Sequence, residues 1–252
     1  SLAVRIYNDK NEIVRNLKWK ADTGFNRHWW GMEERGFRSL NAPRPRPGAP
    51  ETGGLPVFPG TYKIVLALGK EADSTSVTIK DDPRLNKTDD AKRAQRTALD
   101  RLRKSADRLI EAIDRMAESE ETLSKMTVQL RGLEGRENDS LRKMTVAMQD
   151  SIKAIRDYIS GKTSDKQGLS RPQEVTVITL MQTAQQYIFS KSVAPAAQEE
   201  ALVKNAETLT GQTLQRVNAF YNGKWKAYRK QVEDTKVNLF KDYKTIEPAT
   251  FD

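Results

Sequence analysis

The sequence predicts an α+β multidomain protein, in which a small antiparallel β-sandwich is followed by an antiparallel helical bundle. The main observation is a change of period near Asp82. Apolar residues alternate before this point, as in half-buried strands, and recur every three or four positions after it, as in amphipathic helices. The second observation is that six of the ten prolines lie between Pro43 and Pro59, where no helix could continue. We therefore expect a β domain over residues 1–82 and a four-helix up-down bundle over residues 83–252.

Five short segments of the first part are expected to be strands: residues 3–7, 13–19, 25–30, 62–68 and 76–79. They are rich in β-branched or aromatic residues and are separated by turn-forming residues. Asn8, Asp9 and Asn11 favour a turn between the first two segments, which predicts a hairpin. Short strands with frequent turns are typical of an antiparallel sandwich.

A Pro-rich loop insertion is predicted over residues 37–59, because proline lacks the amide that a sheet ladder needs. Arg44 and Arg46 alternate with prolines there, a pattern that resembles an extended recognition segment for an aromatic groove. The alternative is that the loop packs on its own domain or on a neighbouring part of the protein. Both arginines are candidate ligand-binding residues.

Four helices are expected after the change of period, over residues 86–130, 141–159, 172–188 and 195–232. Cap-forming and acidic residues favour a helix start near Thr88. Residues 161–170 form a polar connection, and Pro172 occupies a position where a helix can start. Gly211 and Gly223 weaken the last helix by about 1 kcal/mol each relative to alanine. Short turns between antiparallel helices predict an up-down bundle.

The composition argues against catalysis by this chain. The absence of cysteine excludes disulfides, thiolate metal sites and a cysteine nucleophile, and His28 is the only histidine. Neighbouring carboxylates at Glu33–Glu34 and at Asp81–Asp82 lie in turn or linker positions, where they stay solvated and ionised. No phosphate-cradling glycine motif occurs. We expect no catalytic residue, no metal and no cofactor.

The formal net charge of +9 is spread over the chain, with acidic residues between the basic ones. A nucleic-acid-binding protein usually concentrates positive charge on one face, so we expect a mixed solvated surface and no nucleic-acid partner. No apolar run approaches the roughly 20 residues that span a bilayer. Because the chain begins with Ser1, we expect an excised fragment or a mature chain from which localisation signals were removed.

Two stretches of the β part carry a first resemblance: Trp29-Trp30-Gly31-Met32-Glu33-Glu34-Arg35-Gly36 and Pro59-Gly60-Thr61-Tyr62-Lys63-Ile64-Val65-Leu66. They resemble the Trp-Asp-Gly and Pro/Ala-Gly-Thr-Tyr pattern of the Ig-like module of flagellar hook-capping proteins. Trp30 stands in place of the aspartate, and residues 37–59 separate the two halves. The resemblance implies an Ig-like β-sandwich in which Trp29 is the core ring.

A second resemblance extends over residues 12–84 and is weak across the helices. Four stretches carry it: Leu17-Lys18-Trp19-Lys20-Ala21-Asp22-Thr23-Gly24-Phe25-Asn26-Arg27, Gly53-Gly54-Leu55-Pro56-Val57, Pro59-Gly60-Thr61-Tyr62 and Asp82-Pro83-Arg84. They are similar to the C-terminal region of bacterial sortilin-like or BNR-repeat β-propeller proteins, often labelled glycosyl hydrolases. The resemblance implies an upstream β-propeller that carries any glycan chemistry, and a periplasmic, outer-membrane-associated or secreted location.

Three functions remain open at this point. The chain is expected to be a non-catalytic structural or interaction module of a larger glycan-processing protein. Alternatively it is a glycan-binding accessory module that uses Trp30 and the Pro-rich loop, or a polyanion-binding protein. Neighbouring side chains of a strand point to opposite faces, so Trp29 and Trp30 cannot both face the core. Trp30 is expected to pack under the Pro-rich loop or to contact a ligand, and His28 to pack or lie at the surface, with both kept as candidate ligand-binding residues.

Overall fold

The computed structural model describes residues 1–40, 42–85, 87–162 and 174–235. The chain divides into two compact units: Ser1–Ile110 with Leu180–Glu207, and Glu111–Thr179 with Thr208–Asp252. The first unit holds the β-strands and the beginning of the first long helix. The domain boundary expected after residue 82 stays a prediction. None of the helices in the described ranges has the length and apolar composition needed to cross a membrane.

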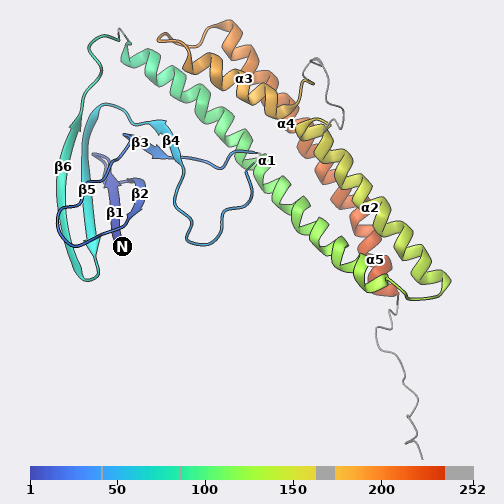
Figure 1. Cartoon of the computed structure of the whole chain (residues 1–252). Helices are drawn as coiled ribbons and strands as arrows, with labels where there is room; N and C mark the ends of the chain where they lie inside the picture. The colour runs from blue at the N-terminus through green and yellow to red at the C-terminus, as the bar shows by residue number, and fades with distance from the viewer. Residues whose placement is uncertain (41, 86, 163–173, 236–252) are drawn as a thin grey trace, which may run out of the picture. The chain divides into compact units, whose positions relative to one another are not determined.

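The β part contains a four-stranded antiparallel sheet in the order β2-β1-β5-β6 (Figure 1). Its strands are β1 (Leu2–Tyr7), β2 (Ile13–Trp19), β5 (Gly60–Leu68) and β6 (Glu71–Ile79). A second, two-stranded sheet pairs β3 (Glu33–Arg35) with β4 (Gly53–Pro56). A small antiparallel sheet together with helices confirms the mixed fold class, while the Ig-like sandwich stays a prediction.

Four of the five expected strands are present, and β6 starts earlier than its apolar end indicated. The strand expected over residues 25–30 is wrong, because this segment runs as a loop without ladder partners. Residues 37–59, expected to be loop throughout, contain β4. Glycine allows this pairing, since a Cβ at Gly54 would lie 2.8 Å from the carbonyl oxygen of Arg35.

One face of the four-stranded sheet holds the core of the β part. Val4, Ile6, Val57 and Tyr62 are buried together there. They are surrounded by partly buried apolar side chains: Leu2, Val14, Leu17, Trp19, Trp30, Ile64, Leu66 and Ile79. Alternation along β1 and β5 places six of them on one side, as expected for a sheet with one solvated face: Leu2, Val4, Ile6, Tyr62, Ile64 and Leu66.

The helical part consists of α1 (Asp89–Leu130), α2 (Arg136–Ser160), α3 (Val177–Phe189), α4 (Ala197–Phe220), a π-helical turn η1 (Tyr221–Trp225) and α5 (Lys226–Asp234). The amide of Ala91 donates a hydrogen bond to Oγ1 of Thr88 at 3.2 Å, which caps the start of α1. Asn86, Pro172 and most of the connection 161–170 lie outside the described residues. The helical character is confirmed, and the four-helix bundle stays a prediction.

The two glycines of the last helical segment behave differently. Helix α4 continues through Gly211, whereas Gly223 lies in the π turn η1. Four aromatic rings follow each other around this turn: Phe220, Tyr221, Trp225 and Tyr228. The Tyr228 hydroxyl is buried and lies 2.9 Å from Oγ1 of Thr145, which joins α5 to α2 within the second unit.

Candidate interaction surface

Residues 20–32 connect β2 to β3, and we call this segment the aromatic loop. Its first half is closed by Asn26, whose Nδ2 donates to the carbonyl oxygens of Asp22 at 2.8 Å and Gly24 at 2.9 Å. The amide of Asp22 donates in return to Oδ1 of Asn26 at 3.0 Å. Gly24 has φ +94°, a conformation that suits glycine in such a turn. Phe25 lies next to this closed turn and is 95% exposed.

The second half of the loop is anchored at alternate residues. The His28 ring stacks on Trp19, with ring centroids 4.7 Å apart. Trp30 meets Tyr62 edge to face at 5.7 Å and donates from Nε1 to the carbonyl oxygen of Glu33 at 2.9 Å. Trp29, between the two anchors, is 76% exposed. Anchoring on both sides therefore holds the Trp29 ring toward solvent.

The expectation that Trp29 is the core ring is wrong, because Trp30 occupies that place. Alternation allows either tryptophan to face inward, and the contacts with Trp19 and Tyr62 select residues 28 and 30. The guanidinium of Arg27 lies over the exposed Trp29 ring, 4.8 Å from its centroid. The outward side of the loop thus presents an exposed indole ring with a cation over one face.

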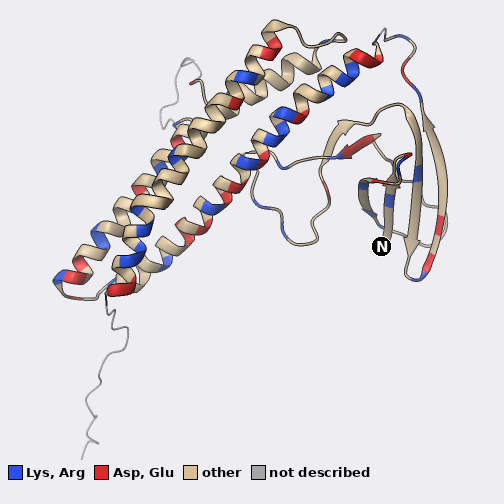
Figure 2. Cartoon of the chain, turned by 180° about the vertical axis from the view of Figure 1, so that it is seen from behind, with Lys and Arg blue, Asp and Glu red and all other residues tan. Residues whose placement is uncertain are grey.

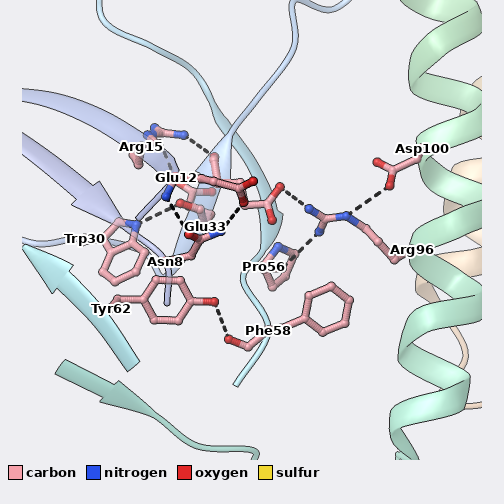
Figure 3. A network of polar contacts seen from close by, with 11 residues as sticks. Asn8, Glu12, Arg15, Trp30, Glu33, Pro56, Phe58, Tyr62, Arg96 and Asp100 are labelled. Carbon is pink, nitrogen blue, oxygen red and sulfur yellow. Dashed lines mark hydrogen bonds and ion pairs between the residues drawn. The ribbon is translucent and has the colours of Figure 1, made fainter. Parts of the chain in front are cut away.

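A buried arginine on β2 joins this strand to the small sheet (Figure 3). Arg15 is 5% exposed, and its Nη1 donates to the carbonyl oxygens of Glu34 at 2.6 Å and Thr52 at 2.5 Å. Its Nη2 donates to the carbonyl oxygen of Glu51 at 3.1 Å and lies 3.8 Å from the carboxylate of Glu33. These bonds join β2 to β3 and to the residues just before β4. We did not anticipate this role, although a charged residue on the face shared by Leu17 and Trp19 is a signal for it.

Tyr62 and Arg96 continue this network inside the first unit (Figure 3). The Tyr62 hydroxyl donates to the carbonyl oxygen of Phe58 at 2.7 Å, and burial raises its pKa, helped by the Glu34 carboxylate. Arg96 of α1 forms an ion pair with Glu34 and lies over the Phe58 ring at 5.6 Å. Figure 2 shows that charges of both signs alternate along the helices.

A pocket of about 280 Å³ lies beside these contacts, and its lining includes Val57, Phe58, Leu99 and Phe189. Two of the three cations that line the pocket are paired with carboxylates, because Arg96 forms an ion pair with Glu34 and Lys92 contacts Asp81 at 2.6 Å and Asp89 at 3.0 Å. The hydrogen bond to Asp81 is the largest cause of the raised pKa of Lys92.

The four candidate ligand-binding residues occupy two different settings. His28 and Trp30 both pack toward the β part, on Trp19 and Tyr62 respectively. Within the described ranges, Nε2 of His28 is buried and has no hydrogen-bond partner. Arg44 and Arg46 are exposed in the Pro-rich loop. None of these placements tests ligand binding, so the four assignments stay predictions.

In the described ranges, no three His, Cys, Asp or Glu side chains are grouped so that they could hold a metal ion. Comparison of the chain with family models, with curated proteins and with solved structures finds no match. A functional assignment must therefore start from the geometry of the aromatic loop and from the sequence resemblance.

Proposed function

We propose that this chain is a non-catalytic interaction module and that the aromatic loop is its contact surface. The observation that carries the proposal is the outward display of Phe25 and Trp29 at 95% and 76% exposure, on a loop whose flanking residues are anchored. Exposed apolar patches commonly mark binding surfaces, and Phe25 and Trp29 are four residues apart on the same loop. Anchoring reduces the conformational entropy lost on binding, so such rings contribute strongly to affinity.

The resemblance over residues 12–84 supports a particular setting for this module. We place it after a β-propeller in a bacterial protein that is periplasmic, outer-membrane-associated or secreted and that takes part in glycan processing. The propeller is then the first partner of the aromatic loop. In this proposal the two sheets are the layers of an Ig-like sandwich, and residues 83–252 form an up-down bundle that extends the module.

A glycan-binding accessory role is the second candidate, and the exposed Trp29 ring is the observation that favours it. Sugar rings stack on indole faces, and the neighbouring Arg27 can donate hydrogen bonds to hydroxyl groups. In this proposal Trp29 is the ring that contacts the glycan, a role that the sequence analysis had assigned to Trp30. The Trp30 ring packs on the core instead, and its Nε1 already donates to Glu33.

Binding measurements with the double variant Phe25→Ala/Trp29→Ala test both roles. The matched control is Val128→Ala, which truncates another exposed apolar side chain, 65% exposed in α1. The first proposal expects the separately expressed upstream region of the protein to bind the chain, with affinity reduced about tenfold or more by the double variant only. Loss of oligosaccharide binding alone would favour the accessory role. If the parent chain, the double variant and Val128→Ala bound both ligands equally well, both proposed roles of the aromatic loop would be contradicted.

Catalysis by the chain itself is tested with aryl glycosides, esters and phosphates. We expect no turnover, because the sequence has a single histidine and no cysteine. Turnover that disappears on a single substitution in this chain would contradict the proposal.

A further inference from the structure

The pocket of about 280 Å³ lies within the first unit and is walled by segments that are far apart in the sequence. Residues 55–59 line one side, and residues 92–99 of α1 line another. Phe189 at the end of α3 and Leu85 just before α1 add apolar surface. Small-molecule sites start at about 300 Å³, so this space suits a ligand of one or two rings.

Apolar residues form most of the lining, so a ligand would be largely apolar as well. Two of these residues are aromatic: Phe58, before β5, is 37% exposed, and Phe189 is 47% exposed. Both rings therefore keep apolar surface that a ligand can cover. Aromatic rings attract one another in offset or edge-to-face contacts beyond the effect of buried area, which favours an aromatic ligand.

Hydrogen bonds from outside the pocket hold the wall that contains Phe58 (Figure 3). The Tyr62 hydroxyl donates to the Phe58 carbonyl oxygen at 2.7 Å, and the Val57 amide donates to the carbonyl oxygen of Met32 at 2.9 Å. On the side of α1, the guanidinium of Arg96 lies over the Phe58 ring at 5.6 Å. A wall that is fixed in this way loses little conformational entropy when a ligand binds.

One polar side chain of the lining has an acceptor left over. Gln95 is 6% exposed, and its Nε2 donates to the carbonyl oxygens of Lys191 and Val193, both at 2.7 Å. These two bonds fix the orientation of the amide and use both of its hydrogens. Within the described residues no hydrogen bond reaches Oε1. Because Gln95 lines the pocket, Oε1 is the atom of this side chain that remains to accept a hydrogen bond from a ligand.

The charges beside the pocket are close to balance. Its lining includes the cations Lys87, Lys92 and Arg96. The ion pairs of the last two involve four carboxylates: Glu34, Asp81, Asp89 and Asp100. Lys87 forms no ion pair in the part of the chain that the structure describes, yet three cations beside four carboxylates leave no excess of positive charge. A neutral ligand is therefore favoured over an anion.

We propose that this pocket binds a small neutral aromatic molecule that carries one hydrogen-bond donor, such as an indole or a phenol. The ring of the ligand covers Phe58 and Phe189, and its N–H or O–H group donates to Oε1 of Gln95. The site goes beyond the proposed function, because it is separate from the aromatic loop.

The test is a ligand-observed NMR titration of the whole chain with indole, which should bind with a Kd below about 1 mM. Benzofuran has the same shape but no donor, and should bind about tenfold more weakly. Phe189→Ala removes one lining ring and should weaken indole binding about tenfold. The matched control is Tyr187→Ala, which truncates a ring of the same helix that is 40% exposed and lies outside the lining, and it should bind like the parent chain.

Two outcomes on the parent chain would overturn the inference even if Phe189→Ala failed to fold: no binding of indole, or equal affinity for indole and benzofuran. Tighter binding of indole-3-acetate than of indole would also overturn it, because Lys87 would then act as the counterion of an anionic ligand. Tighter binding of N-acetyltryptophanamide would replace the free molecule by a tryptophan side chain of a partner protein.

The aromatic loop is separated from this site by the variant Trp29→Ala. Weaker indole binding to this variant would overturn the inference, because indole would then occupy the loop. If Phe25→Ala/Trp29→Ala lost binding to the upstream region but kept indole binding, the inference would stand. It would also stand if the aromatic loop proved to have no partner while the indole measurements gave the expected results.

Discussion

Replacing Arg15 by methionine removes the side chain that joins β2 to the small sheet. The three carbonyl oxygens that accept its hydrogen bonds, on Glu34, Glu51 and Thr52, would then lose a charged donor. Hydrogen bonds to a charged group each contribute about 1.5–3 kcal/mol, and breaking a buried charged network typically destabilises by about 3–5 kcal/mol. Because Arg15 is 5% exposed, water can compensate little, and we expect a loss of about 3–5 kcal/mol in the first unit.

The assay must report on the first unit alone, since the chain divides into two compact units. Amide hydrogen exchange, followed by mass spectrometry on peptides from residues 1–80, measures the free energy of opening locally. The control is Lys18→Met on the same strand, which replaces an exposed cation and should change this free energy by less than about 0.5 kcal/mol. If the free energy of opening of Arg15→Met lay within about 1 kcal/mol of that of Lys18→Met, the reasoning would be refuted.

Three further predictions concern side chains with defined partners. Trp30→Ala should destabilise the first unit by about 3–5 kcal/mol in the same exchange assay, because this ring packs on the core. Trp29→Ala should destabilise it by less than about 1 kcal/mol, because this ring is exposed. Equal losses for the two variants would contradict the assignment of Trp30 as the core ring. Tyr228→Phe should destabilise the second unit by about 1 kcal/mol, measured by exchange in α5, and no change would mean that the buried hydroxyl bond is weak. The hydrogen bond from Arg101 lowers the pKa of Glu207 below its ordinary value of 4.5. The stabilisation of the folded chain by this ion pair is therefore complete above pH 4.5 and is lost as the pH falls through the lowered pKa. Glu207→Gln should therefore reduce the fall in the free energy of unfolding between pH 7 and pH 3, measured by urea unfolding at a series of pH values. The same fall in the variant and in the parent chain would contradict the role of this ion pair.

The elements with strong local periodicity were predictable. Alternation in β1, β2 and β5 and helical spacing from α1 onward are properties of neighbouring residues, so they could be recognised along the chain. The same holds for the cap at Thr88, since its side chain bonds an amide three residues later. The candidate interaction surface could not be predicted in this way, because its exposed ring, Trp29, was assigned to the core.

The sequence by itself indicated β1, β2, β5, the end of β6 and the helical part, and it showed that no cysteine chemistry is available. Only the tertiary structure decided which of two neighbouring tryptophans faces inward, because alternation is equally satisfied by Trp29 and Trp30. It likewise decided the pairing of β3 with β4, which depends on Arg15 and on glycine at residue 54. These contacts join residues about 20 to 40 positions apart, and their energies depend on distances that no local pattern encodes.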